Sequence, residues 1–418
     1  MKVTFCSFDG PNCINGPNAW LRRLVPELQS RGIQTQIIFT TSVPEQECTT
    51  LPLLRQAGIE CMVIPLLPCY TEYRVRWIIE KLAQEPPDVF VPNMIVPALY
   101  AGRWVREAGI PTIGVLHSDD EEHRGIISEF VLGPAYQLSG IVCVSQELEQ
   151  QLQQHPPRTV VRRLPYGAPI PERVASVPNQ KLRITYVGRL VEEQKRISEV
   201  TRALCRAVRE VPETEAVIYG SGPDRITVEQ ILQAEGSGLP ICLAGRVDSE
   251  QMQQRLLNCH VIVLLSDYEG LPVALMEAMA CGVVPVCLSI RSGIPELVED
   301  GVTGLLVGDR GDDFVAAIKR LRQESGLWHQ LSQQARAKIQ TEYSHQACAM
   351  RWEQFLTELH QSAGSRRSIK VPFQLNLPPV HPGLARSDYR TPPIHTRVWQ
   401  KSQRIAGQIK GKLLSGSF

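Results

Sequence analysis

Short apolar runs alternate with segments of helical periodicity along most of the chain. In the first half, runs of strand length lie at 3–8, 36–39, 62–64, 89–91, 112–116 and 141–144. Between them, apolar residues recur three and four positions apart, as Leu21, Leu24, Val25 and Leu28 do, which is the spacing of one helix face. Strands separated by helices predict a parallel sheet with right-handed crossovers.

The alternation stops at a proline-rich segment, 164–171, and then restarts. Proline at this density favours an extended connection between domains. Further strand-length runs follow at 182–187, 216–219, 241–243, 261–265 and 283–286. A single core rarely exceeds about 250–300 residues, and this chain has 418. We therefore predict an α/β fold of two facing, doubly wound, Rossmann-like domains, at 1–172 and 173–345. A helix that crosses back, 346–364, and a tail, 365–418, would complete the chain.

The strongest signal for chemistry is the segment 266–286, which joins two predicted strands of the second domain. A loop carries Glu269 and Gly270, and Pro272 is then a good first residue for a helix. In parallel sheets, ligands bind outside the carboxyl ends of the strands. The free N–H groups of this helix would point there and could bind an anion or sugar hydroxyls. Glu277 lies about 1.5 turns inside the helix, so its carboxylate and that of Glu269 can address two parts of one ligand.

A second signal follows the first strand of the second domain. Gly188 tightens the strand end and presents Arg189, and Lys195 comes just before the next helix. The planar fork of arginine and the point charge of lysine suit a diphosphate. Negative charge grows on a departing diphosphate in the transition state, so these cations would accelerate the reaction. Glycines at 220–222 and at 245 end neighbouring strands, where the backbone could approach a nucleotide closely.

Two features of the first domain face the same crevice. Gly16 and Pro17 open a helix whose start could meet a distal phosphate. His117 follows the strand 112–116 directly, at the end where a polar side chain can reach a ligand.

In this order, the motifs resemble the retaining glycosyltransferases of family four, which have the GT-B fold. The resemblance covers residues from about 1 to 362. It rests on Glu269 and Glu277 with seven residues between them, Gly188-Arg189 followed by Lys195, and the segments 220–223, 293–296 and 300–304. Each motif alone is only suggestive, whereas five in one order are highly specific.

The resemblance implies a metal-independent enzyme that transfers a hexose from a nucleotide-sugar donor, with retention of anomeric configuration, to a glycan, lipid or small-molecule hydroxyl. In this interpretation Arg189 and Lys195 bind the diphosphate, Glu277 binds the ribose, and Val247 contacts the base. Glu269 would bind the sugar, and His117 would line the acceptor side. The implied catalytic residues are Arg189, Lys195, Glu269 and His117. The donor site would comprise Gly16, Arg189, Lys195, Gly220, Gly222, Val247, Glu269, Gly270, Leu271 and Glu277.

Two departures weaken parts of this assignment. Gly16-Pro17 stands where family members often carry a glycine pair, and Pro17 lacks a backbone N–H donor. Pro165-Tyr166-Gly167-Ala168 stands where Pro-Asn-Gly is common, which leaves sugar contacts there open.

Other interpretations remain at this stage. Arg189 and Lys195 could be surface cations, Glu269 a charge that complements the helix dipole, and His117 a satisfied core residue. A nucleotide-sugar epimerase of the same fold and a non-catalytic nucleotide-sugar sensor are the alternative functions. The acidic run 117–123 favours a solvated loop over a metal site. No strand precedes a Gly-x-Gly-x-x-Gly motif, and no Asp-x-Asp triplet occurs. We expect no metal and no cofactor.

Composition narrows the class of protein further. The formal net charge is +1, so overall charge gives no reason to expect a nucleic-acid partner. The twelve cysteines form no Cys-x-x-Cys pair and mostly lie in apolar runs, which favours reduced thiols and a cytoplasmic protein. We recognise no signal peptide and no run of about 20 apolar residues.

The tail after Ser365 differs in charge from the rest of the chain. Its ten lysines and arginines face a single acid, Asp388. Val398, Ile405, Ile409 and Leu413 recur at roughly helical spacing among these cations. Two interpretations stay open: peripheral contact with an anionic membrane, or a tail that is disordered or packs back on the first domain.

Overall fold

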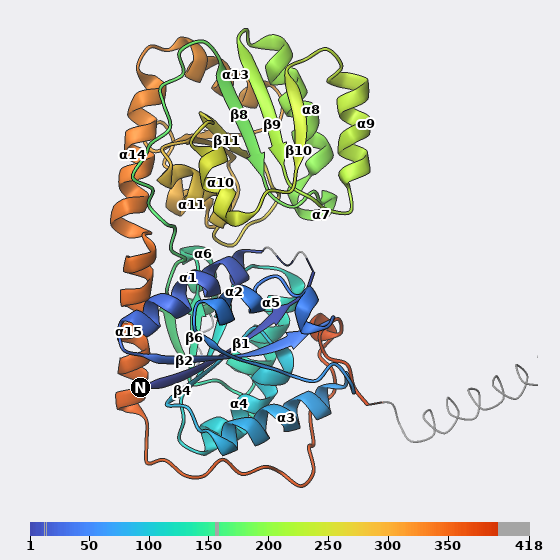
Figure 1. Cartoon of the computed structure of the whole chain (residues 1–418), viewed down its shortest axis with the longest axis vertical. Helices are drawn as coiled ribbons and strands as arrows, with labels where there is room; N and C mark the ends of the chain where they lie inside the picture. The colour runs from blue at the N-terminus through green and yellow to red at the C-terminus, as the bar shows by residue number, and fades with distance from the viewer. Residues whose placement is uncertain (12, 14, 155–158, 392–418) are drawn as a thin grey trace, which may run out of the picture.

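The computed structural model describes residues 1–391 apart from residues 12, 14 and 155–158. Two lobes are stacked along the long axis, each built around one sheet with helices on its faces (Figure 1). Throughout the described part of both sheets, neighbouring strands pair in parallel. The predicted α/β, two-domain fold is therefore confirmed.

The N-terminal domain holds a seven-stranded sheet of order β3-β2-β1-β4-β5-β6-β7. Its strands are β1 (Lys2–Asp9), β2 (Gln34–Thr41), β3 (Glu60–Val63), β4 (Val89–Asn93), β5 (Thr112–Leu116), β6 (Gly140–Cys143) and β7 (Val160–Arg163). Its helical elements are α1 (Gly16–Ser30), η1 (Glu45–Glu47), α2 (Leu51–Gln56), α3 (Thr71–Gln84), α4 (Val96–Glu107), α5 (Glu121–Ile126), η2 (Ile127–Leu132) and α6 (Gln146–Gln153).

The C-terminal domain holds a six-stranded sheet of order β10-β9-β8-β11-β12-β13. Its strands are β8 (Leu182–Val187), β9 (Thr214–Tyr219), β10 (Ile241–Gly245), β11 (Val261–Leu264), β12 (Val284–Leu288) and β13 (Leu305–Val307). Its helices are α7 (Glu192–Lys195), α8 (Ile197–Glu210), α9 (Arg225–Glu235), α10 (Ser249–Leu256), α11 (Val273–Ala280), α12 (Ile294–Leu297), α13 (Asp312–Gln323) and α14 (Leu327–Glu342).

The sequence missed two edge strands and misplaced one helix start. β7 ends in two arginines and alternates between exposed and half-buried positions, so it carries no apolar run. β13 has only three residues, too few for a periodic signal. Pro272 was predicted as the first helical residue of α11, but it is the N-cap, with an extended backbone at φ −75° and ψ 107°.

The chain crosses between the domains twice at one place. α14 belongs to the C-terminal domain, and α15 (His345–Ser362) follows it along one side of the molecule and packs on α1 (Figure 1). The linker runs beside this junction: Ala168 N–H donates to the Tyr343 carbonyl at 2.8 Å, and His345 N–H donates to the Ala168 carbonyl at 3.0 Å. The two crossings therefore form a single hinge region.

Residues 365–391, here called the C-terminal strap, return across the N-terminal domain (Figure 1). Arg366 pairs with Asp88 at 2.6 Å, and Leu384, in η3 (Pro382–Leu384), is fully buried against α5. Asp388 is buried with Arg390, whose Nε lies 2.6 Å from its carboxylate. For this part of the tail, packing on the first domain is the correct alternative. The predicted amphipathic segment at 398–413 lies outside the described residues.

Within the described ranges, no helix is both long and apolar enough to cross a membrane. All twelve cysteines fall in these ranges, and each is a free thiol.

Candidate active site

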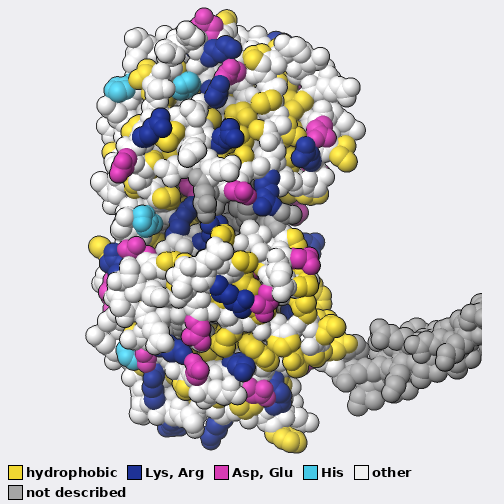
Figure 2. All heavy atoms as spheres, viewed as in Figure 1, with side chains coloured by type: hydrophobic (Ala, Val, Ile, Leu, Met, Phe, Trp, Pro, Cys, Tyr) yellow, Lys and Arg dark blue, Asp and Glu magenta, His cyan; other side chains and the backbone are white. Residues whose placement is uncertain are grey.

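The site lies where the carboxyl ends of the two sheets face each other. Figure 2 shows the surface hollowed at the level where the lobes meet, with Lys and Arg side chains at its edge. A close approach between the domains involves Gly270, in the loop after β11. A Cβ atom on Gly270 would lie 2.0 Å from the carbonyl oxygen of His117, which follows β5. Only glycine fits here, so the predicted loop of the second domain directly contacts the predicted histidine of the first.

Glycines let the strand ends of the C-terminal domain pack backbone on backbone. A Cβ on Gly220 would lie 2.0 Å from the Gly188 carbonyl oxygen, and one on Gly222 would lie 2.3 Å from that of Leu190. The Gly220 N–H donates to the Gly245 carbonyl at 2.9 Å. Gly220 and Gly222 thus have a structural role as spacers whether or not a ligand contacts them. Val247 lies two residues after Gly245 and is half-buried.

Lys195 and Glu269 meet in this site. Lys195 ends α7, Glu269 precedes Gly270, and the two side chains form an ion pair. They are 13% and 7% exposed, so the pair is mostly withdrawn from water and solvent screens it little. Arg189 lies on the exposed side of the same loop, where its Nη2 donates to Gln194 at 2.9 Å. Lys195, the predicted phosphate-binding cation, is therefore paired with Glu269, the predicted sugar-binding carboxylate.

Glu277 pairs with a residue that the sequence did not indicate. Its Oε1 accepts a hydrogen bond from Nη2 of Arg23, on α1 of the other domain, and both side chains are 20% exposed. Arg23 Nη1 also donates to the Gly167 carbonyl of the linker at 3.4 Å. Two residues separated by 254 positions give no periodic or motif signal, so sequence reasoning could not find this contact.

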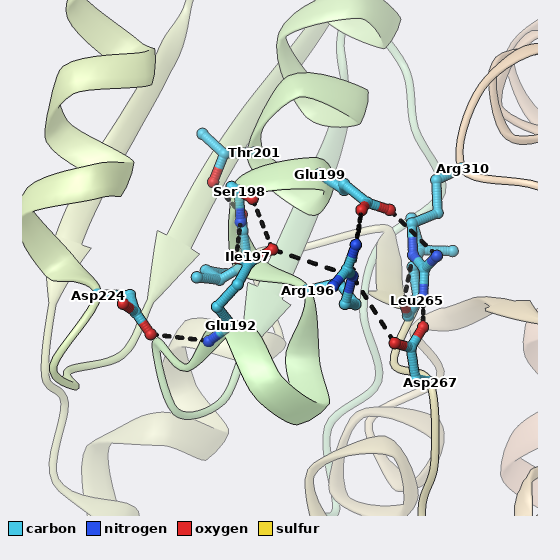
Figure 3. A network of polar contacts seen from close by, with 10 residues as sticks. All are labelled: Glu192, Arg196, Ile197, Ser198, Glu199, Thr201, Asp224, Leu265, Asp267 and Arg310. Carbon is cyan, nitrogen blue, oxygen red and sulfur yellow. Dashed lines mark hydrogen bonds and ion pairs between the residues drawn. The ribbon is translucent and has the colours of Figure 1, made fainter.

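A network behind the loop fixes its position (Figure 3). Arg310 donates to the Leu265 carbonyl at 2.8 Å and pairs with Asp267, and its Nη1 reaches Glu199 at 3.2 Å. Arg196 bonds to Glu199 on α8 and lies 3.7 Å from Asp267. Arg196 has a left-handed backbone, with φ 49°, which ends α7 and starts α8. The residues just before Glu269 are thus held from two directions.

The His117 side chain is enclosed. It is 6% exposed, its Nε2 lies 2.6 Å from Oδ1 of Asn93, and its Nδ1 bonds to the Tyr166 hydroxyl. Asn93 Oδ1 can only accept, so Nε2 donates to it, and in the neutral ring Nδ1 then accepts a hydrogen bond from the Tyr166 hydroxyl. Burial lowers the pKa of His117 well below its usual value of 6.5. With both nitrogens bonded in this structure, His117 faces the crevice with its backbone carbonyl.

Gly16 starts α1 opposite the start of α11. A Cβ on Gly16 would lie 3.4 Å from a methyl group of Val273, so the two helix starts meet across the interface. Asn15 caps α1 by accepting from the Asn18 N–H. Leu271 is buried beside Gly270, and its neighbour Gly270 accepts from the Gly293 N–H at 2.9 Å.

A second ion pair also crosses the interface, nearer the hinge. Arg163, at the end of β7, lies 2.8 Å from Glu296 of α12. Glu296 also accepts from the Gln146 N–H, and burial raises its pKa.

Two family matches divide the chain where the structure divides it. Residues 172–338 match the family described as "Glycosyl transferases group 1", and residues 14–169 match "Glycosyltransferase Family 4". The chain belongs to the group 1 glycosyltransferases. Within this family, the match to the second domain includes Arg189, Lys195, Glu269 and Glu277.

Curated glycosyltransferases are similar in sequence to part of this chain. The amylovoran biosynthesis glycosyltransferase AmsK of Erwinia amylovora is 36% identical over 176 residues, 40% of this chain and 42% of AmsK. The N-acetyl-alpha-D-glucosaminyl L-malate synthase of Bacillus anthracis is 30% identical over 162 residues, 38% of this chain and 41% of the synthase. The alignments thus cover less than half of either relative.

Solved structures support the fold over a longer range. Anabaena HepE, in a complex with UDP and glucose, superposes with a TM-score of 0.69 at 17% identity, over 86% of this chain and 100% of HepE. The Thermosynechococcus elongatus sucrose-phosphate synthase gives 0.71 at 18% identity, over 87% and 100%. At this identity the likeness shows the GT-B fold of the group 1 glycosyltransferase and nothing finer.

Among the residues that the structure describes, no three or more His, Cys, Asp or Glu side chains are grouped as a metal site. Sequence reasoning assigned no role in the site to three polar residues of the N-terminal domain and the linker: Asn93, Tyr166 and Arg23. Asn93 has a left-handed backbone at the end of β4, with φ 58°. An asparagine there is a weak signal, because asparagine tolerates that conformation better than most residues.

Proposed function

We propose that this protein transfers a hexose from a nucleotide-sugar donor to an acceptor hydroxyl, without a metal ion and with retention of anomeric configuration. The observation that supports the proposal most is the Lys195–Glu269 ion pair. It joins a cation suited to a diphosphate and a carboxylate suited to sugar hydroxyls, at the crevice of a group 1 glycosyltransferase.

The roles follow from position and charge. The donor diphosphate would lie between Lys195 and Arg189, which is exposed and can turn toward a ligand. The sugar would lie against Glu269 and the backbone of Gly270 and Leu271. The ribose would bind Glu277, and the base would lie near Val247. HepE, whose solved complex holds UDP and glucose, supports this class of donor by analogy of fold.

In the reaction we propose, the bond between the anomeric carbon and the phosphate oxygen breaks while the acceptor oxygen bonds to the same face of that carbon. The acceptor proton passes to an oxygen of the departing diphosphate. Lys195 and Arg189 stabilise the charge that grows there, a role that a divalent cation has in other enzymes. The His117 carbonyl, fixed against Gly270, can accept a hydrogen bond from the sugar near the anomeric carbon.

The test uses pure protein and a panel of UDP-, GDP-, ADP- and TDP-sugars, with EDTA present. The nucleotide sugars of one base should be cleaved, because without an acceptor we expect the enzyme to transfer the sugar slowly to water. NMR at early times should show the anomer of the donor. The inverted anomer would contradict retention, activity only after metal addition would contradict metal independence, and a sugar altered while still attached to its nucleotide would favour an epimerase.

A further inference from the structure

Among the residues that the structure describes, Glu277 is the only predicted donor residue with an ion pair to the other domain. Its partner is Arg23. Lys195 and Glu269, by contrast, satisfy each other within the C-terminal domain. A carboxylate assigned to the ribose is therefore held by a side chain from the domain assigned to the acceptor.

Arg23 is itself fixed on two sides. Nη2 donates to Glu277, and Nη1 donates to the Gly167 carbonyl of the linker at 3.4 Å. Gly167 packs closely on the start of α15, since a Cβ added there would lie 2.5 Å from the Cα of His345. The guanidinium thus bridges the first helix, the linker and the donor helix α11.

The pair leaves one oxygen of Glu277 available. Arg23 contacts Oε1, and no described residue donates a hydrogen bond to Oε2. The side chain is one-fifth exposed, so a ligand in the crevice can reach it. An ionised carboxylate can accept at both oxygens, and a fixed carboxylate binds a ribose hydroxyl with less loss of rotational freedom than a free one.

We propose that Arg23 is a positioning residue for the donor: it orients Glu277 so that one carboxylate oxygen accepts from Arg23 and the other from the ribose hydroxyls. Recognition of the ribose then requires the N-terminal domain in place beside α11, and ribose binding favours the closed arrangement of the two domains. The inference rests on the proposed function, because it assumes a nucleotide donor at Glu277.

The experiment separates the ribose from the rest of the nucleotide. Dissociation constants are measured by calorimetry for UDP, GDP and ADP and for their 2′,3′-dideoxy forms, and the best-binding pair is used. Wild-type protein should prefer the ribonucleotide by at least about tenfold, the effect of losing a hydrogen bond to a charged group. Arg23→Gln should lose most of this preference, while its affinity for the dideoxy form stays within about twofold of wild type.

Arg163→Gln is the matched control. It breaks another cross-domain ion pair, to Glu296, without touching Glu277. It should keep the wild-type preference for the ribonucleotide even if overall affinity falls. Binding of the dideoxy form also shows that each variant is folded at the site. Arg23→Lys, which keeps the charge but not the fork, should restore part of the preference.

Three results would overturn the inference. In the first, the Arg23→Gln variant keeps the wild-type preference for the ribonucleotide. In the second, it loses affinity equally for both nucleotide forms, as expected if Arg23 only holds the domains together. In the third, it binds the ribonucleotide more tightly than wild type, as expected if Arg23 blocks the site. Failure of the proposed function looks different: wild-type protein would bind none of the diphosphates, or would not discriminate ribose from dideoxyribose at all.

Discussion

The two halves of the crevice are built in different ways. On the donor side, Lys195 ends the short helix α7 that follows β8, Glu269 lies in the loop after the adjacent strand β11, and the two side chains pair with each other. On the acceptor side, His117 bonds to Asn93 and Tyr166, which come from a different strand and from the linker. The donor side is thus a pair of opposite charges within one domain, whereas the acceptor side is a histidine ring held by two uncharged polar groups.

The difference in burial has a chemical consequence. On the donor side, Lys195 and Glu269 form an ion pair, and Arg189 beside them is exposed to an incoming ligand. The His117 ring is neutral and enclosed, so it can position a backbone carbonyl but offers no free nitrogen in this state. We therefore expect substitutions on the donor side to change turnover, and substitutions around the His117 ring to change stability first.

The largest effect should follow Lys195→Ala. It removes a cation from the departing diphosphate and leaves Glu269 buried without its partner. Turnover of the donor should fall by about 10²–10³, the usual effect of removing one transition-state charge partner. Lys181→Ala, which breaks an exposed pair with Glu215, should change little. Equal turnover by the two variants would show that Lys195 does not act on the departing diphosphate.

Gly270→Ala tests the contact between the two halves. The new Cβ would clash with the His117 carbonyl and push the loop from the N-terminal domain, so kcat/KM should fall by about 10² for a displacement near 1 Å. Gly364→Ala, where no atom lies within 4 Å of the added Cβ, is the control. A fully active Gly270→Ala enzyme would show that the halves need not approach this closely.

A smaller effect is expected for Tyr166→Phe. The change leaves the buried Nδ1 of His117 without a donor, at a cost of about 1–3 kcal/mol in the free energy of unfolding. Nucleotide affinity should remain near that of wild type. Denaturant unfolding and calorimetry measure the two quantities, with Tyr389→Phe, at an exposed position, as the control. A loss of nucleotide affinity without a loss of stability would contradict the division between the halves.

The smallest effect concerns pH. Burial holds the pKa of His117 below 6.5 in the folded state, whereas the unfolded chain binds a proton at about 6.5. Below that pH the unfolded state therefore binds more protons than the folded state. The stability that this difference in pKa contributes is fully present above about pH 6.5 and is lost as the pH falls. His260, with its pKa lowered to about 4 by burial and by Arg183, acts in the same direction. His117→Gln should flatten the decrease in melting temperature between pH 7 and pH 5; an unchanged slope would contradict the assignment.

How far the sequence predicts the molecule follows from the same contrast. The bounds of β5 were predicted exactly as they stand because Pro111 and His117 enclose five apolar or small residues. Glu269 and Glu277 could be proposed together because one strand, loop and helix contain both. Their local spacing on a parallel sheet is enough to place them at its carboxyl edge.

The partners of these residues could not be predicted. Tyr166 meets His117 across 49 positions, and Arg23 meets Glu277 across 254. The first contact depends on how the linker folds back on the N-terminal domain and the second on how the two domains pack, and neither periodicity nor spacing reports such long-range contacts. The same holds for the C-terminal strap, whose charge suggested a membrane or a disordered tail as readily as packing. The buried pair of Asp388 with Arg390 carried no signal in the sequence.

The most direct test of the account is the thermal stability of the protein with a panel of nucleotide sugars. Wild-type protein should be stabilised by one nucleotide class, by about 2.7 kcal/mol at a concentration one hundred times the dissociation constant. The double variant Arg189→Ala with Lys195→Ala should lose this shift at the same concentration. No shift in wild type with any nucleotide sugar, or an equal shift in the double variant, would contradict a donor site at Arg189, Lys195 and Glu269.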